Sequence, residues 1–159
     1  MVATEANSSL TSHSSEETRR LGACLAPLLQ PGDVIVLTGD LGAGKTVFAK
    51  GIADGLGASG EVTSPTFVIL HQLKGRLTLY HFDLYRLESA KEFVALGFDD
   101  ILYGDGVSVL EWGDKFPDQL PSERLELVFH FDDGDERRIE VRAEDERWQQ
   151  VVREWTARC

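Results

Sequence analysis

The sequence predicts an α/β fold in which a mixed β-sheet is flanked by helices. Residues 34–38 form a continuous apolar run that leads through a glycine-rich segment into a helical stretch, as a buried parallel strand and its crossover helix do. Behind this unit, β-rich runs come in pairs separated by short turn segments, which is typical of antiparallel hairpins. A chain of 159 residues suits one domain, and we find no internal repeat.

The start of the chain is interpreted from its composition and its capping residues. Residues 1–13 are rich in Ser, Thr, Asn and Ala and lack periodicity, so we expect a disordered tail. Ser14 and Glu17 have the spacing of a capping box, and they open a predicted helix that extends to about Leu29 with one apolar stripe. Pro31-Gly32 ends that helix before the first buried strand.

The remaining elements follow from apolar periodicity and turn residues. In chain order they are a strand at 34–38, a helix from Lys45 to about Leu56, a hairpin of 67–73 and 76–81 joined at Lys74-Gly75, a helix at 88–96 that stops at Gly97, a strand at 107–110, an antiparallel pair at 125–131 and 138–142, and a helix from about Glu144. We divide the chain into the tail 1–13, one domain at 14–142, and an amphipathic helix at 143–159. The apolar stripe of that helix, Trp148, Val151, Val152 and Trp155, is expected to pack on the domain, with docking against a partner as the alternative.

The charge is unevenly placed along the chain. The net charge is −11, and residues 98–147 alone carry 16 acidic against 6 basic side chains. An acidic half repels phosphate backbones, so we expect no strong direct binding of nucleic acid. A solvated acidic face explains the same pattern without a partner.

Cellular location and redox state are inferred from what the sequence lacks. No apolar run is long enough to span a bilayer, and the first residues have neither the basic flank nor the apolar core of a secretory signal, so we expect a cytoplasmic protein without a membrane partner. Cys24 and Cys159 have no metal-ligand spacing, and we expect both to be reduced, unpaired thiols.

The most specific motif is the segment GDLGAGKT at Gly39–Thr46. It matches the pattern G-x-x-x-x-G-K-[ST] of a phosphate-binding P-loop, and it lies between a predicted strand and a predicted helix. Glycines let the backbone N–H groups converge on an anion, and the helix that follows adds the positive end of its dipole. We therefore predict a single P-loop NTPase-like domain that binds ATP and Mg²⁺, with Lys45 at the β- and γ-phosphates and Thr46 at the metal. The predicted nucleotide contacts are Asp40, Leu41, Gly42, Ala43, Gly44, Lys45, Thr46 and Val47.

An acidic residue at a strand end is the second part that such a site needs. Glu111 ends the predicted strand at 107–110, and we assign it to the metal, although most P-loop enzymes use Asp there. The hydroxyl-rich segment Thr63–Phe67 is either a switch that responds to the γ-phosphate or an ordinary polar turn.

Two further side chains are candidates near the nucleotide. His81, Asp83 and Tyr85 share one face of an extended segment, and Asp83 can take a metal-bound water or orient the attacking one; capping or surface exposure is its alternative role. We assign Asp83, Glu111 and Lys45 as catalytic residues. Arg137 is a candidate nucleotide contact, although arginines on a hairpin more often pair with neighbouring acids.

Four blocks together resemble the bacterial TsaE family, also called YjeE. They are GDLGAGKT at Gly39–Thr46, TSPTF at Thr63–Phe67, HFDLYRL at His81–Leu87 and VLEW at Val109–Trp112, and the match spans about residues 14–142. Members of this family are the ATPase component of the machinery that places threonylcarbamoyl on the adenosine beside the anticodon of certain tRNAs. The resemblance departs at Val47, where a second hydroxyl residue is common, and beyond residue 143, where no motif matches.

The resemblance implies a P-loop sheet flanked by helices, with Mg²⁺ held by Thr46 and Glu111, a catalytically important Asp83, and a switch at Thr63–Thr66. It also implies a modest ATPase that acts in a complex with two partners, TsaB and TsaD, of which TsaD performs the transfer to tRNA. Contact with tRNA would then be indirect.

Two other functions suit a small P-loop domain. A small-molecule kinase needs an arginine-bearing lid, and between Ser89 and Trp112 only Lys91 is basic. A regulatory module that binds nucleotide without turnover is the other alternative, because no arginine finger is evident.

Overall fold

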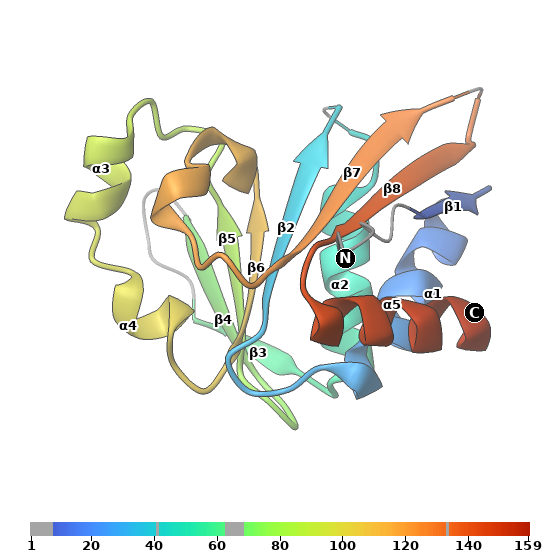
Figure 1. Cartoon of the computed structure of the whole chain (residues 1–159), viewed down its shortest axis with the longest axis horizontal. Helices are drawn as coiled ribbons and strands as arrows, with labels where there is room; N and C mark the ends of the chain where they lie inside the picture. Colours follow the sequence, from blue (N-terminus) through green and yellow to red (C-terminus); the bar gives the residue numbers. More distant parts are fainter. Residues whose placement is uncertain (1–7, 41, 63–68, 133) are drawn as a thin grey trace.

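The computed structural model describes residues 8–40, 42–62, 69–132 and 134–159, and its centre is one eight-stranded mixed sheet (Figure 1). The strand order is β1-β8-β7-β2-β6-β5-β4-β3. The strands are β1 (Ser8–Ser12), β2 (Val34–Gly39), β3 (Ser59–Val62), β4 (Leu70–Lys74), β5 (Leu79–Asp83), β6 (Val107–Glu111), β7 (Leu125–Phe131) and β8 (Arg137–Ala143). The predicted α/β class with a mixed sheet is confirmed.

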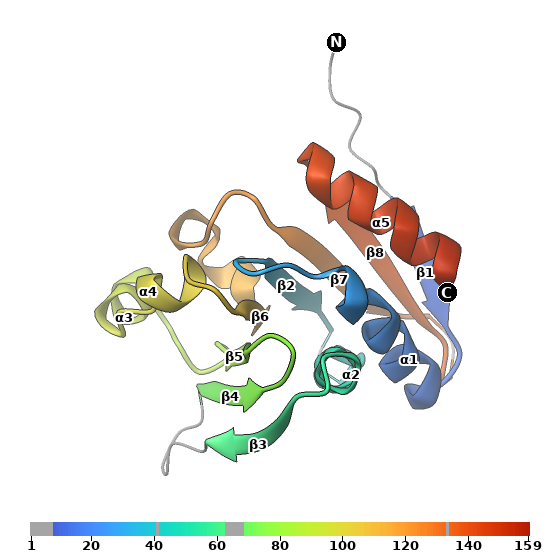
Figure 2. The same cartoon turned by 90° about the horizontal axis from the view of Figure 1, so that it is seen from below.

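Helices follow the strands in an order that places them on both faces of the sheet. The α-helices are α1 (Ser15–Leu25), α2 (Lys45–Gly55), α3 (Ala90–Ala95), α4 (Asp99–Leu102) and α5 (Glu146–Arg158). Three short 3-10 helices complete the set: η1 (Ala26–Leu28), η2 (Gly113–Lys115) and η3 (Pro117–Gln119). Figures 1 and 2 show α1, α2 and α5 together at one side of the molecule and α3 and α4 at the other.

The centre of the sheet is parallel, and its two sides are built from hairpins. β2 runs parallel to both β6 and β7, and β5 runs parallel to β6. The outer pairs β7–β8, β1–β8, β4–β5 and β3–β4 are antiparallel. The carboxyl ends of β2, β5 and β6 therefore meet at one edge, which is where ligands bind in open α/β sheets.

Side chains that alternate along the central strands pack into two separate hydrophobic cores, one on each face of the sheet. On one face, Ile35 and Leu37 of β2 pack with α1, α2 and α5, including the fully buried Trp155. On the other face, Val34 and Val36 pack with a smaller cover made by α3, α4 and residues that flank η2 and η3. This alternation is the period of two that a strand buried on both faces requires.

Capping residues explain where the predicted helices begin and end, and one predicted helix end differs from the structure. The hydroxyl of Ser14 accepts the N–H of Glu17 at 3.1 Å, so the predicted cap does begin α1. The helix ends earlier than predicted, at Leu25, and continues as η1, in which Pro27 occupies one of the first two positions. Gly97, with φ of 68°, follows α3 as predicted.

The prediction that residues 1–13 form a disordered tail is wrong in part, because Ser8–Ser12 form β1. This strand pairs antiparallel with β8, from Ser8 opposite Val141 to Ser12 opposite Arg137. The mostly polar sequence of β1 lacks the apolar pattern that predicts a strand. The strand is stabilised by pairing with a segment more than 120 residues away. Residues 1–7 lie outside the described part of the chain.

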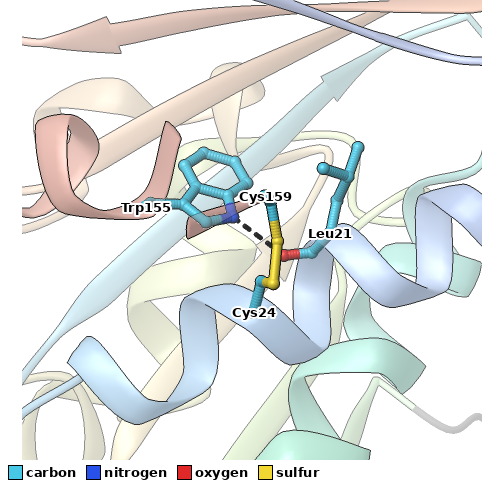
Figure 3. The surroundings of a disulfide bond; sticks show 4 residues. All are labelled: Leu21, Cys24, Trp155 and Cys159. Atoms are coloured by element: carbon cyan, nitrogen blue, oxygen red, sulfur yellow. Dashed lines mark hydrogen bonds between the residues drawn. A yellow bond between two sulfur atoms is a disulfide. The ribbon is translucent and has the colours of Figure 1, made fainter. Parts of the chain in front are cut away.

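The two cysteines also contradict the prediction, because Cys24 of α1 and Cys159 form a disulfide (Figure 3). Their Cα atoms are 6.5 Å apart although 135 residues separate them in sequence. Packing explains the encounter: α5 docks on α1, where the indole N–H of Trp155 donates to the carbonyl of Leu21 at 2.9 Å. Spacing along the chain gives no sign of this contact.

Loss of the disulfide should lower stability without undocking α5. Replacing Cys159 by Ser removes a link that closes a long loop of the unfolded chain, and we expect a loss of about 2–4 kcal/mol in the free energy of unfolding. Urea unfolding in the absence and presence of a thiol reductant measures this difference. The variant and the reduced wild type should unfold at the same midpoint, below that of the oxidised wild type. Equal midpoints for oxidised and reduced wild type would show that the link contributes nothing.

Candidate functional site

The P-loop connects the carboxyl end of β2 to the first turn of α2 at the centre of the sheet. Gly39 has φ of 115°, and a Cβ there would lie 2.1 Å from the carbonyl oxygen of Phe129 on β7, so only glycine fits this crossing. Gly44, with φ of 105°, is the N-cap of α2 and provides no side-chain cap. The first N–H groups of α2 are therefore not capped by a side chain, as an anion site at a helix N-terminus requires.

Lys45 is buried and is held on three sides. Its Nζ donates to the carbonyl oxygens of Gly39 at 2.8 Å and Asp40 at 2.9 Å, and it lies 4.0 Å from the ring centroid of Trp112. Burial lowers the pKa of the Lys45 ammonium from its ordinary value, while nearby carboxylates, of which Glu111 has the largest effect, act in the opposite direction. The side chain is thus fixed before any ligand arrives.

Thr46 and Glu111 meet although 65 residues separate them in sequence. The hydroxyl of Thr46 donates to the Glu111 carboxylate at 2.9 Å to Oε1 and 3.1 Å to Oε2. Parallel pairing of β2 with β6 places Leu37 opposite Glu111, which brings the end of β6 beneath the start of α2. His81 of β5 approaches the same carboxylate, with Nε2 at 2.5 Å from Oε2.

Asp83 lies at the same edge as Glu111 and faces it across neighbouring strands. Their Cα atoms are partners in the register of β5 and β6. The side chain of Asp83 is exposed, and its Oδ1 accepts the backbone N–H of Tyr85 at 3.1 Å. This bond is the local capping role that we considered as an alternative, and it coexists with a position at the predicted site.

These residues surround one pocket of about 260 Å³. It is lined by Gly42, Gly44, Lys45, Thr46, Val47, Asp83, Tyr85, Glu111 and Trp112. The sequence-predicted loop, the acid of β6 and the acid of β5 are therefore brought together. Arg137 does not line this pocket: it lies at a smaller one, of about 80 Å³, which includes Gly42, Gly44 and Val47 on another side of the loop.

Arg137 is engaged by its own hairpin. Its guanidinium lies 4.0 Å from the ring centroid of Phe131 and donates to the carbonyl of Gly134 at 3.0 Å. Two predicted groups, Leu41 and Thr63–Phe67, lie outside the described residues.

Sequence reasoning assigned no role to Trp112, which the structure places in the lining of the pocket. Among the described non-glycine residues it alone has a positive φ, of 65°, and this left-handed turn directly after β6 brings its ring to Lys45. The ring of Tyr85 lies 5.1 Å away, centroid to centroid. The sequence feature that could have pointed to Trp112 is its position directly after Glu111.

The donor set near the loop is small and consists of oxygen atoms. Within the described ranges, no group of three or more His, Cys, Asp or Glu side chains is arranged to hold a metal ion. Mg²⁺ at nucleotide sites takes one or two protein ligands together with phosphates and water, so Thr46 and Glu111 suit it. Within the same ranges, no helix is long and apolar enough to cross a membrane.

Comparisons with known proteins show which family the chain resembles. Residues 12–139 match the family model described as threonylcarbamoyl adenosine biosynthesis protein TsaE. A tRNA threonylcarbamoyladenosine biosynthesis protein TsaE from Treponema pallidum is 50% identical over 110 residues, which cover 69% of this chain and 82% of that protein. The protein of the same description from Bacillus subtilis is 44% identical over 140 residues, 87% of each chain.

A solved structure also supports the fold. The crystal structure of Bacillus subtilis YdiB superposes with a TM-score of 0.82 and 36% sequence identity, covering 98% of this chain and 97% of the other. Taken with the family model and the relatives, this shows that the chain belongs to the TsaE family of threonylcarbamoyl adenosine biosynthesis proteins.

Proposed function

We infer that this protein is an ATPase that binds ATP with Mg²⁺ at its P-loop and serves tRNA threonylcarbamoyladenosine modification within a complex. The observation that carries the inference is the convergence of Lys45, Thr46 and Glu111 on one pocket at the carboxyl edge of the sheet. A loop lysine, a loop hydroxyl and an acid at the end of a neighbouring strand are the three parts that P-loop ATPases use.

The phosphate chain would be bound by the loop backbone and by Lys45. The N–H groups of residues 42–47 and the start of α2 provide a positive field at the pocket, and the Lys45 ammonium is already desolvated beside it. Because the ammonium is held by two carbonyl oxygens and an aromatic ring, it needs little reorganisation to exchange carbonyl partners for phosphate oxygens.

The metal would be held by Thr46 and Glu111. Both groups present hard oxygen ligands within hydrogen-bonding distance of each other, and their small number leaves the other positions to phosphates and water. When bound, Mg²⁺ neutralises charge on the β- and γ-phosphate oxygens.

Asp83 is proposed to orient the attacking water. It is exposed at the mouth of the pocket and lies beside Glu111 in the strand register, so it can accept a hydrogen bond from a water that approaches the γ-phosphate. Its bond to the N–H of Tyr85 uses one carboxylate oxygen and fixes the orientation of the other. Thr63–Thr66 remain a proposed switch on the grounds of sequence.

The smaller pocket beside the loop is proposed to take the nucleoside. Ser14, Thr18 and Val47 line it together with Arg137 and Asp135, so it offers polar groups and one planar cation next to the phosphate site. Arg137, which stacks on Phe131, is the proposed contact there.

The acidic half of the chain favours a division of labour with partner proteins. A net charge of −11 disfavours close approach to tRNA, so we propose that TsaB-like and TsaD-like partners contact the nucleic acid and that this chain acts on them. Because tRNA modification is intracellular, we propose that it works in the cytoplasm.

Removing either carboxylate should suppress hydrolysis much more than nucleotide binding. Asp83→Asn and Glu111→Gln keep the shape of each side chain but remove the charge that acts on water or metal. We expect the turnover number for ATP to fall by roughly 100-fold or more in each. Phosphate release and equilibrium ATP binding, measured on the same preparations, separate the two effects. Normal hydrolysis by Asp83→Asn would assign that side chain to its local bond with Tyr85 alone.

The role in tRNA modification is tested by reconstitution with TsaB-like and TsaD-like partners. Repeated rounds of modification should require this chain and hydrolysable ATP, and Glu111→Ala should not replace the wild type. The chain alone should bind tRNA weakly or not at all at physiological salt. Equal multiple-turnover modification with wild type, with Glu111→Ala and without the chain would contradict the proposal.

A further inference from the structure

We propose that His81 is a positioning residue that holds the Glu111 carboxylate in the orientation from which it receives a metal ion. The proposal rests on the function inferred above and extends it to a residue that neither the P-loop pattern nor the strand-end acid identifies. Its basis is the contact between His81 Nε2 and Glu111 Oε2 at 2.5 Å, between side chains that are 15% and 7% exposed.

The sheet brings these two side chains together by register. His81 pairs with Val109 in the parallel ladder of β5 and β6, and Glu111 lies two residues further along β6. Residues two apart on a strand share a face, so the imidazole and the carboxylate are diagonal neighbours on the face that carries α2. The contact between His81 and Glu111 is therefore fixed by the backbone pairing of β5 with β6.

The chemistry of the contact indicates which atom donates. An ionised carboxylate has only acceptor sites, and the Thr46 hydroxyl lies within donating distance of both oxygens of Glu111. A hydrogen bond between His81 and this carboxylate therefore requires a form of the ring in which Nε2 carries a hydrogen. His81 donates to Oε2, and this bond limits rotation of the carboxylate about the last bond of the side chain.

The length of the Glu111 side chain explains why a hydrogen bond is needed to orient its carboxylate. P-loop enzymes mostly place Asp at this strand end, whereas this chain has Glu, whose side chain has one more rotatable bond. Thr46 cannot be an independent anchor because it is itself a proposed metal ligand. His81 is not itself a proposed metal ligand, and ligands around metals are commonly oriented by such outer hydrogen bonds, whose loss costs about 10–100-fold in metal affinity or activity.

A neighbouring histidine supplies the matched control. His71 of β4 is the register partner of His81, and the centroids of the two rings are 6.1 Å apart. It lies one strand further from β6, and no bond joins it to Glu111 among the interactions of the described residues. Replacing His71 removes a similar ring from the same part of the sheet while leaving the carboxylate contact intact.

The experiment compares His81→Met, His81→Gln and His71→Met in the full chain. Gln and Met have similar shapes, but only Gln carries an N–H donor near the place of Nε2. Binding of ADP is followed by calorimetry in EDTA and across a magnesium titration, after circular dichroism has checked each fold. We expect equal ADP affinity in EDTA for all four proteins. The quantity compared is the magnesium concentration at which half of the magnesium-dependent change in ADP affinity has occurred. In His81→Met this concentration should rise about 10–100-fold. It should return at least partly toward the wild-type value in His81→Gln and stay unchanged in His71→Met.

The outcomes distinguish this proposal from the function on which it rests. Absence of magnesium-dependent ADP binding in the wild type would remove both. A normal wild type with unchanged magnesium dependence in His81→Met would overturn the positioning role alone. Equal weakening by His71→Met, or no recovery in His81→Gln, would also overturn it, because the loss would then follow ring packing and not the donated hydrogen bond.

Discussion

The close crossing of the P-loop over β7 is the constraint on which the rest of the site depends. At Gly39 the chain leaves β2 with a backbone so near Phe129 that no side chain fits between them. This approach lets the loop turn back on itself and start α2 directly above the strand ends. Lys45 and Thr46 are thereby delivered to the edge where β5 and β6 end, and the two faces of β2 remain buried in separate cores that hold the edge rigid.

The chemistry at this edge comes from strand register more than from loop conformation. Glu111, Asp83 and His81 come from two strands that are separate in sequence and adjacent in the sheet, and parallel pairing aligns them at one edge. Of the three, Glu111 accepts the hydroxyl of Thr46 at the start of α2 and also contacts His81. A hydrogen bond between Thr46 and Glu111 links loop to strand, and a second between His81 and Glu111 links strand to strand. These contacts hold Lys45, Thr46 and Glu111 in place around the pocket.

Local signals predicted the fold class and most of the residues that line the pocket, whereas β1, the disulfide and the position of Trp112 were missed. The apolar run of β2, the Ser14 cap and the P-loop are properties of short segments, so the sequence displays them directly. β1 was missed because its polar residues gain stability only from pairing with β8. The disulfide was missed because it depends on α5 docking on α1. The place of Trp112 depends on a left-handed turn after β6, which no residue type announces.

We propose that the ammonium of Lys45 binds the phosphates of ATP in this pocket. Calorimetry of ATP with Mg²⁺ tests it on the wild type, Lys45→Ala and Lys50→Ala, since both variants lose one positive charge from α2 but Lys50 is exposed away from the pocket lining. We expect Lys45→Ala to weaken ATP binding by about 100-fold or more, as the loss of a charge-assisted contact does. Lys50→Ala should bind ATP as the wild type does, and both variants should keep the circular dichroism spectrum of the wild type. Unchanged affinity in Lys45→Ala, or equal loss in the two variants, would show that Lys45 does not bind the phosphates.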